Sequence, residues 1–88
     1  MKTVEIFTTP VCHFCNLAKE FMNANGISFT SYDVTKDLVR RQELIDLGAM
    51  GVPLIRISGD GIQPIIMNGF GDDEADTLSR EFKKGKYA

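Results

Sequence analysis

Three absences in this 88-residue sequence exclude whole classes of protein. The formal net charge is only −2, so the chain lacks a broad positive surface for nucleic acid or anionic lipid. No apolar run approaches the roughly 20 residues that a membrane-spanning helix needs. Residues 1–4 do not show the charged segment followed by an apolar segment that is typical of a leader, so we expect a cytoplasmic protein. We therefore predict neither nucleic acid nor membrane as a partner.

The chain also lacks internal repeats, low-complexity segments and linkers. Eighty-eight residues are enough for one modest hydrophobic core and too few for two. The composition, 43% hydrophobic and 25% charged, is that of an ordinary globular protein. We predict a single domain that spans residues 1–88.

Cysteine and histidine are scarce, and this scarcity restricts the chemistry. The chain has two cysteines, Cys12 and Cys15, and one histidine, His13, between them. Structural zinc takes four ligands, and no second cysteine pair exists to supply them. Haem attachment needs a histidine at the position of Asn16. Because a lone disulfide is seldom structural in the cytosol, we favour redox chemistry. The alternative is metal binding across a dimer, including a bridging iron–sulfur cluster.

The hydrophobic pattern predicts seven elements in the order β-α-β-α-β-β-α. We expect strands at 3–7, 27–34, 52–57 and 62–67, and helices at 12–25, from Thr35 to Leu47, and from Asp72 past Phe82. The first strand, helix and strand form a right-handed unit with parallel strands. Pro64 favours an edge position for the fourth strand. The predicted fold is α/β and thioredoxin-like, a four-stranded mixed sheet flanked by three helices.

Each predicted helix has an apolar face, and glycines mark two of the helix ends. The face of the first helix contains Phe14, Leu17, Ala18, Phe21 and Met22, and Gly26 ends that helix. For the second helix we expect Thr35 as the N-cap, Gly48 as the stop, and an inner face of Leu38, Val39, Leu44 and Ile45. The third helix buries Ala75, Leu78 and Phe82.

The place of the two cysteines predicts their chemistry. Cys12 lies at a helix N-terminus, where unpaired N–H groups and the positive end of the helix dipole favour a thiolate. We expect its pKa to lie below the ordinary value of about 8.5. Cys15, one turn further in, is the resolving partner. His13 either tunes the thiolate or is an exposed spacer. Phe14 is expected to shape a partner-facing surface.

Several motifs together resemble those of the glutaredoxin family over nearly the whole chain. The matching segments are residues 4–8, Cys12–Cys15 with Ala18-Lys19 after it, 26–29, Val52-Pro53, and Gly69 with Asp72-Asp73. Asn68-Gly69-Phe70, with an acid after it, also resembles the Ser-Gly-Phe segment of the NrdH redoxins. Those proteins are glutaredoxin-like in sequence and thioredoxin-like in behaviour, and they reduce ribonucleotide reductase.

The resemblance implies roles for individual residues at the cysteine motif. Cys12 matches the nucleophilic cysteine of the family, and Cys15 matches the resolving one. Phe14 stands where glutaredoxins usually carry a tyrosine, and His13 replaces a proline. Thr9 stands in the place of a lysine that, in many glutaredoxins, lies near the thiolate and the glutathione carboxylate.

The resemblance also implies a substrate site formed by residues in the second half of the sequence. Pro53 matches a proline that is cis and opposite the active site, and the backbone of Val52 would pair with the cysteinyl part of glutathione. Gly69, Asp72 and Asp73 complete this site, the acids meeting the glutathione amino group. Asp72 and Asp73 read equally well as acids that stabilise a helix start. Gly51, before Val52, replaces a usual threonine, and Gly71 changes the family's spacing.

Together these observations predict a small dithiol–disulfide oxidoreductase of the glutaredoxin type. We expect it to reduce protein disulfides or glutathione mixed disulfides, with glutathione as co-substrate, no tightly bound cofactor and no metal. One alternative is an NrdH-type redoxin that is reduced by thioredoxin reductase and donates electrons to ribonucleotide reductase. The other is a dimer that binds an iron–sulfur cluster. We expect a monomer with disulfide-containing protein clients.

Overall fold

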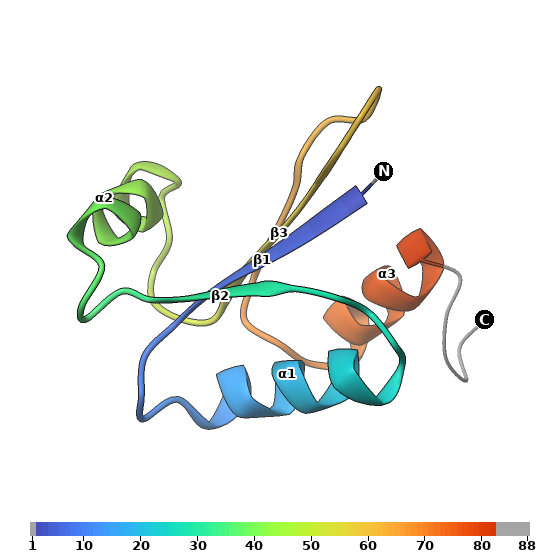
Figure 1. Cartoon of the computed structure of the whole chain (residues 1–88), viewed down its shortest axis with the longest axis horizontal. Coiled ribbons are helices and arrows are strands. Elements are labelled where there is room, and N and C mark those ends of the chain that lie inside the picture. Colours follow the sequence, from blue (N-terminus) through green and yellow to red (C-terminus); the bar gives the residue numbers. More distant parts are fainter. Residues whose placement is uncertain (1, 83–88) are drawn as a thin grey trace.

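Four strands and three helices make up residues 2–82, the part of the chain that the structure, a computed structural model, describes. Their order is the predicted β-α-β-α-β-β-α (Figure 1). They are β1 (Lys2–Thr8), α1 (His13–Ala24), β2 (Thr30–Asp33), α2 (Leu38–Asp46), β3 (Leu54–Gly59), β4 (Ile65–Asn68) and α3 (Asp72–Phe82). Among these helices, none has the length and hydrophobicity needed to cross a bilayer.

The four strands form one mixed sheet in the order β2-β1-β3-β4. β1 runs parallel to β2 and antiparallel to β3, and β3 runs antiparallel to β4. The register aligns Thr8 with Asp33, Phe7 with Leu54, and Leu54 with Asn68. The last residues of β1, β2 and β4 and the first residue of β3 therefore meet at one end of the sheet. We call this end, marked by Thr8, Asp33, Leu54 and Asn68, the site end.

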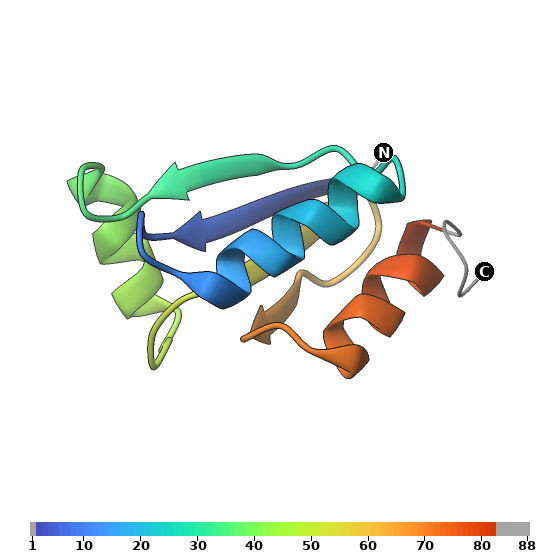
Figure 2. The ribbon, with the colours of Figure 1, turned by 90° about the horizontal axis from the view of Figure 1, so that it is seen from below.

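The helices cover the sheet unequally. α1 and α3 lie side by side along one face, and α2 lies apart from them (Figures 1 and 2). Because neighbouring strand residues point to opposite faces, Val4 and Ile6 join the larger core with α1 and α3, whereas Phe7 packs in a smaller core with Leu44 of α2. The thioredoxin-like arrangement that the sequence predicts is confirmed.

α1 begins one residue later than predicted, and its buried face differs from the predicted one. Cys12 is its N-cap, and Gly26, at φ +69°, follows its C-terminal end as expected. Cys15, Ala18 and Met22 are fully buried. Phe14 and Leu17, which we predicted on the buried face, are exposed at 55% and 37%. Phe14 is thus placed for the partner-facing role that we expected of it.

The start of α2 corrects the sequence prediction. Its N-cap is Asp37, whose carboxylate accepts a hydrogen bond from the Arg40 N–H at 3.1 Å, and Thr35 is not the cap. The reason is a competing turn. The Asp33 carboxylate accepts hydrogen bonds from the Thr35 N–H and hydroxyl at 2.9 and 2.6 Å, so Thr35 lies in a loop before the helix.

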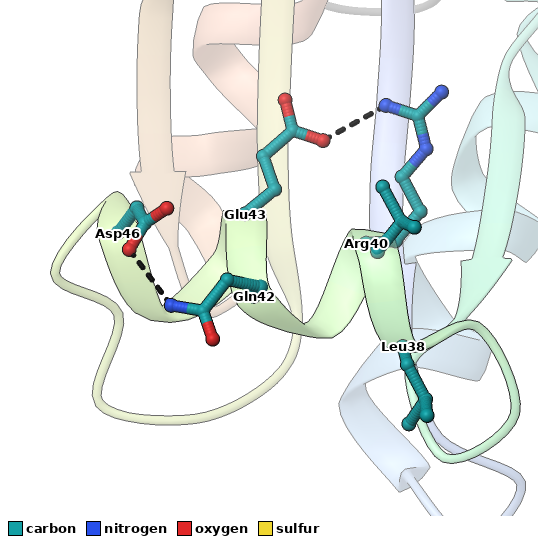
Figure 3. A pocket seen from close by; sticks show the side chains of 6 residues that line it. Leu38, Arg40, Gln42, Glu43 and Asp46 are labelled. Atoms are coloured by element: carbon teal, nitrogen blue, oxygen red, sulfur yellow. Dashed lines mark hydrogen bonds and ion pairs between the residues drawn. The ribbon is translucent and has the colours of Figure 1, made fainter.

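The buried face of α2 is also different from the predicted one. Of the four residues that we assigned to it, Leu44 alone is buried, and Leu38, Val39 and Ile45 are exposed at 67%, 77% and 57%. Figure 3 shows Arg40 and Glu43 joined on one side of α2, with Leu38 pointing away from them. α2 thus faces the sheet with two charged side chains as well as Leu44.

Two strand boundaries shift because of proline. β3 begins at Leu54, directly after Pro53, and β4 begins at Ile65, directly after Pro64. Proline has no N–H to offer the ladder, so each strand starts behind it and not at the predicted 52 or 62. β4 is an edge strand, as Pro64 predicts. β2 is also shorter than predicted, because residues 27–29 precede its pairing with β1.

Candidate active site

Cys12 and Cys15 are joined by a disulfide at the start of α1, with their Cα atoms 5.2 Å apart. As the N-cap, Cys12 has an extended backbone, and its Sγ accepts a hydrogen bond from the Cys15 N–H at 3.1 Å. Cys15 is completely buried, whereas Cys12 is partly exposed. Only the Cys12 sulfur is therefore open to an approaching disulfide.

The charges near this helix start favour an anion on Cys12. The first turn of α1 contains no acidic residue, whereas the first turn of α3 contains three, Asp72, Asp73 and Glu74. The positive end of the α1 dipole and the Cys15 N–H are thus left to stabilise a negative sulfur. This arrangement supports Cys12 as the nucleophile and Cys15 as the resolving thiol.

Exposed side chains surround the disulfide. Val11 is 93% exposed, and Phe14 stands out from the first turn of α1. The exposed ring of His13 meets the Phe14 ring edge-on, with centroids 5.4 Å apart. His13 is thus part of the surface next to Cys12, and its role in tuning the thiolate stays a prediction.

Val52 and Pro53 form the second part of the site. The peptide bond between them is cis, as the family resemblance implies. The Gly69 N–H donates to the Pro53 carbonyl at 2.7 Å, which ties the loop before β3 to the end of β4. Gly69 has φ +98°, a conformation that favours glycine. A hollow of about 260 Å³ opens here, lined by Met50, Gly51, Val52, Asn68 and Gly69.

The backbone of Val52 is available to a ligand. Within residues 2–82, neither its N–H nor its carbonyl takes part in a hydrogen bond, since the β3 ladder starts two residues later. Backbone groups left open in this way can pair with an extended peptide as a strand edge does. Val52 is partly buried and Pro53 is buried, so the loop is held in place.

The sheet register gathers the predicted site residues at one end of the molecule. Cys12 follows the end of β1, Val52-Pro53 precedes β3, and Gly69 follows β4, all at the site end. Asp72 and Asp73 open α3 just beyond Gly69 and are exposed. The register therefore brings the cysteine motif, Val52-Pro53 and Gly69 to one end of the sheet, and Asp72 follows Gly69 by three residues.

A charged network that sequence reasoning missed lies beneath α2. Arg56 of β3 bonds to Glu5 of β1 and to Glu43 of α2, each at 2.8 Å, and Tyr32 of β2 donates to Glu5 at 2.7 Å. The hydrogen bond from Arg56 lowers the pKa of Glu5, and the bonds from Arg40 and Arg56 lower the pKa of Glu43. Only the register, which pairs Glu5 directly with Arg56, reveals this network.

The network also bears on the position of Val52 and Pro53, because α2 leads into the loop that contains them. Leu47, Ala49 and Val52, in and after the last turn of α2, pack against the smaller core. A larger hollow of about 700 Å³ lies on α2 itself, lined by Leu38, Arg40, Glu43 and their neighbours, and it contains no cysteine (Figure 3). The smaller hollow is lined by no cysteine either, but its residues Val52 and Gly69 lie at the site end, where the chain also continues from β1 to the Cys12–Cys15 disulfide.

The described residues give no new support to metal binding. Within residues 2–82, no cluster of three or more histidine, cysteine, aspartate or glutamate side chains is placed to hold a metal ion. The iron–sulfur alternative requires a second copy of the chain and stays a prediction.

A βαβαββα fold with a Cys-x-x-Cys disulfide at the start of its first helix defines a thiol–disulfide oxidoreductase of the thioredoxin-like superfamily. Within that superfamily the chain belongs to the glutaredoxin family, whose family model matches residues 4–62. It is 34% identical over 76 residues to a glutaredoxin-like 8.6 kDa protein of Clostridium pasteurianum, covering 85% of this chain and 95% of that protein.

Two further relatives come from Escherichia coli. Glutaredoxin 3 is 33% identical over 63 residues, which are 70% of this chain and 76% of that protein. The solved structure of the NrdH-redoxin is similar with a TM-score of 0.73 at 25% identity, covering 86% of this chain and 93% of that one. That protein is described as glutaredoxin-like with a thioredoxin-like activity profile.

Proposed function

We propose that the protein reduces disulfides whose cysteine is presented in an extended backbone, in glutathione mixed disulfides and in protein clients. The observation that carries this proposal is the open backbone of Val52 at the same end of the sheet as the Cys12–Cys15 disulfide. A cysteinyl residue paired with Val52 would direct its sulfur along the site end, toward the helix start that bears Cys12.

The reaction is a pair of thiol–disulfide exchanges. The Cys12 thiolate attacks one sulfur of the substrate disulfide, that bond breaks, and the other sulfur leaves as a thiolate that takes up a proton. Cys15 then loses its proton and attacks the Cys12 sulfur in the mixed disulfide, releasing the second substrate thiol. The products are a reduced substrate and the Cys12–Cys15 disulfide, so two electrons have moved to the substrate.

We propose that glutathione returns the enzyme to its reduced form. Two glutathione molecules supply the two electrons and leave as glutathione disulfide. Family membership and the acids Asp72 and Asp73 near Gly69 support this route. In this proposal glutathione is a co-substrate and the protein holds no organic cofactor.

Thioredoxin reductase is the second candidate donor, and one observation favours it. The five residues that line the hollow at Val52 are all uncharged, so the hollow itself offers no cation to a glutathione carboxylate. The similar NrdH-redoxin, with its thioredoxin-like activity profile, supports the same alternative. In that case ribonucleotide reductase is a candidate client.

Paired assays distinguish the two donors. The oxidised protein is incubated either with glutathione and glutathione reductase or with thioredoxin reductase, and NADPH consumption is followed in both. We expect faster turnover with glutathione. Rapid turnover with thioredoxin reductase and none with glutathione would establish the second candidate instead. A Cys12→Ser variant, which has no nucleophile, serves as the blank in both assays.

A further inference from the structure

The ion pair between Glu43 of α2 and Arg56 of β3 joins the two ends of the segment that contains Val52 and Pro53. Arg56 Nη1 donates to Glu43 Oε2 at 2.8 Å, and the two residues are 13 positions apart in the chain. The last turn of α2, the loop 47–53 and the first residues of β3 all lie between them. The pair therefore closes the base of the loop that presents the Val52 backbone.

Each partner of this pair is also held on its own side. On the sheet, Arg56 Nε donates to Glu5 of β1 at 2.8 Å, and Arg56 Cζ lies 5.5 Å from the centre of the Phe7 ring. On the helix, Arg40 Nη1 donates to the other carboxylate oxygen of Glu43 at 2.8 Å. The side chains of Arg56 and Glu43 are 16% and 30% exposed, so solvent screens their attraction less than that of a surface pair. The pair is thus an oriented link between α2 and the sheet.

The segment before Val52 takes its position from α2. The Leu47 N–H donates to the Glu43 carbonyl at 2.9 Å. The Ala49 N–H donates to the Leu44 carbonyl at 3.3 Å. The side chains of Leu47, Ala49 and Val52 pack against the smaller core, to which α2 contributes its buried leucine. A shift of α2 relative to the sheet would therefore move the chain that leads into Val52.

Cys12 does not depend on this pair. It is the N-cap of α1, and α1 packs through Ala18 and Met22 in the larger core, on the opposite face of the sheet from the smaller core. None of the residues with which Glu43 and Arg56 form ion pairs lies on α1. Loosening α2 should therefore change how a substrate is aligned and leave the reactivity of the Cys12 sulfur as it is.

We propose that Arg56 and Glu43 are positioning residues, whose ion pair holds α2 against β3 and so keeps the Val52 backbone aligned for an extended substrate whose disulfide reaches Cys12. The inference rests on the proposed function, because it takes the substrate to pair with Val52. The two charged side chains themselves make no contact with the substrate in this proposal. Breaking the pair should slow exchange with disulfides that have a peptide backbone and spare disulfides that have none.

The test compares two disulfides that both react with Cys12. One joins two copies of a short uncharged peptide through a central cysteine, and the other is 2-hydroxyethyl disulfide, which has no backbone to pair with Val52. The protein is reduced chemically beforehand, so the identity of the electron donor does not enter. Arg56→Met, Glu43→Gln and the double variant are measured. Lys2→Met, the control, breaks a partly exposed ion pair between β1 and α3, which does not involve α2.

The measured quantity is the second-order rate constant for the peptide disulfide divided by that for 2-hydroxyethyl disulfide. A loss of folded protein lowers both rate constants equally and leaves this ratio unchanged. We expect Arg56→Met and Glu43→Gln each to lower the ratio about two- to ten-fold. The double variant should lower it no more than the larger single change, because the two residues act through one contact. Lys2→Met should leave the ratio unchanged.

Amide hydrogen exchange adds a measurement that involves no substrate. The Leu47 and Ala49 N–H groups should exchange faster in the two single variants than in the control variant. Ratios and exchange rates equal to those of the control would overturn the positioning role, and so would additive losses in the double variant. Faster amide exchange with an unchanged ratio would keep the link from the ion pair to the loop and contradict the proposed pairing of the substrate with Val52.

Discussion

At the scale of single residues, Cys12 and Cys15 lie three positions apart and have different surroundings. Cys12 is the N-cap of α1 and partly exposed, and it receives the Cys15 N–H. Cys15 is completely buried one turn further on. Exposure and the helix dipole therefore support the proposal that Cys12 is the attacking sulfur, and the burial of Cys15 supports its proposed role in the internal step.

Replacing each cysteine by serine should separate these two steps. We expect Cys12→Ser to abolish all exchange, because no accessible nucleophile is left. Cys15→Ser should still remove glutathione from mixed disulfides at a reduced rate, since a second glutathione can resolve the Cys12 adduct, but it should not reduce protein disulfides through an internal disulfide. Exchange with a glutathionylated peptide measures this. An active Cys12→Ser and an inactive Cys15→Ser would reverse the assignment.

Among the helices and strands, α2 is held to the sheet by both apolar and charged side chains. Leu44 is its one buried side chain. Arg40 and Glu43 point to the same side, where Arg40 lies 4.2 Å from the centre of the Tyr32 ring and Glu43 meets Arg56. Its contact with the sheet therefore has both an apolar and an ionic part, and Leu38 and Ile45 are left on the surface.

Matched leucine truncations should reveal this orientation. Leu44→Ala removes a side chain that is 8% exposed and should lower the free energy of unfolding by about 2–4 kcal/mol. Leu38→Ala, on the same helix but 67% exposed, should change it by less than about 0.5 kcal/mol. Urea unfolding of both variants gives the two values. Equal losses would mean that α2 presents the face that the sequence pattern suggested.

For the molecule as a whole, the network around Arg56 connects three elements that are distant in the chain. Glu5 on β1, Arg56 on β3 and Glu43 on α2 are joined by bonds of 2.8 Å, and their side chains are between 16% and 30% exposed. Both carboxyls have a folded-state pKa below the ordinary 4.5. They therefore stabilise the fold fully above pH 4.5, and this contribution falls as the pH drops through their lower folded-state values.

Removing Arg56 should lower the free energy of unfolding at neutral pH and weaken the dependence of that free energy on pH. We expect Arg56→Met to lose about 1–3 kcal/mol at pH 7, because two partly buried carboxylates lose their charged partner. The difference from the unmodified protein should shrink as the pH falls through the lowered folded-state pKa values of Glu5 and Glu43, since a protonated carboxyl no longer pairs with Arg56. Arg80→Met, whose ion pair with Asp76 is exposed, is the control and should change little. A difference that is constant with pH would argue that packing, not charge, is what Arg56 supplies.

Local patterns in the chain determined the order of its elements and the place of the redox pair. The apolar periodicities, the glycines and the prolines act on a few neighbouring residues, so the βαβαββα order and Cys12 as the start of a helix follow from the sequence alone. Gly26 beyond the end of α1 and the edge position of the strand near Pro64 were predictable for the same reason, although that strand starts after Pro64 and not at 62. Val52 and Pro53 were identified through family resemblance.

Only the tertiary structure decided which distant side chains meet. The face that α2 presents to the sheet includes Glu43, which bonds to Arg56. Arg56 in turn is paired with Glu5 by the strand register, and no local pattern in the sequence contains that register. Val52 and Gly69 share a hollow because β3 and β4 run antiparallel, so that the start of one strand lies beside the end of the other. The sequence determines elements through interactions between near neighbours, whereas a site assembled from several strand ends depends on the register of the sheet.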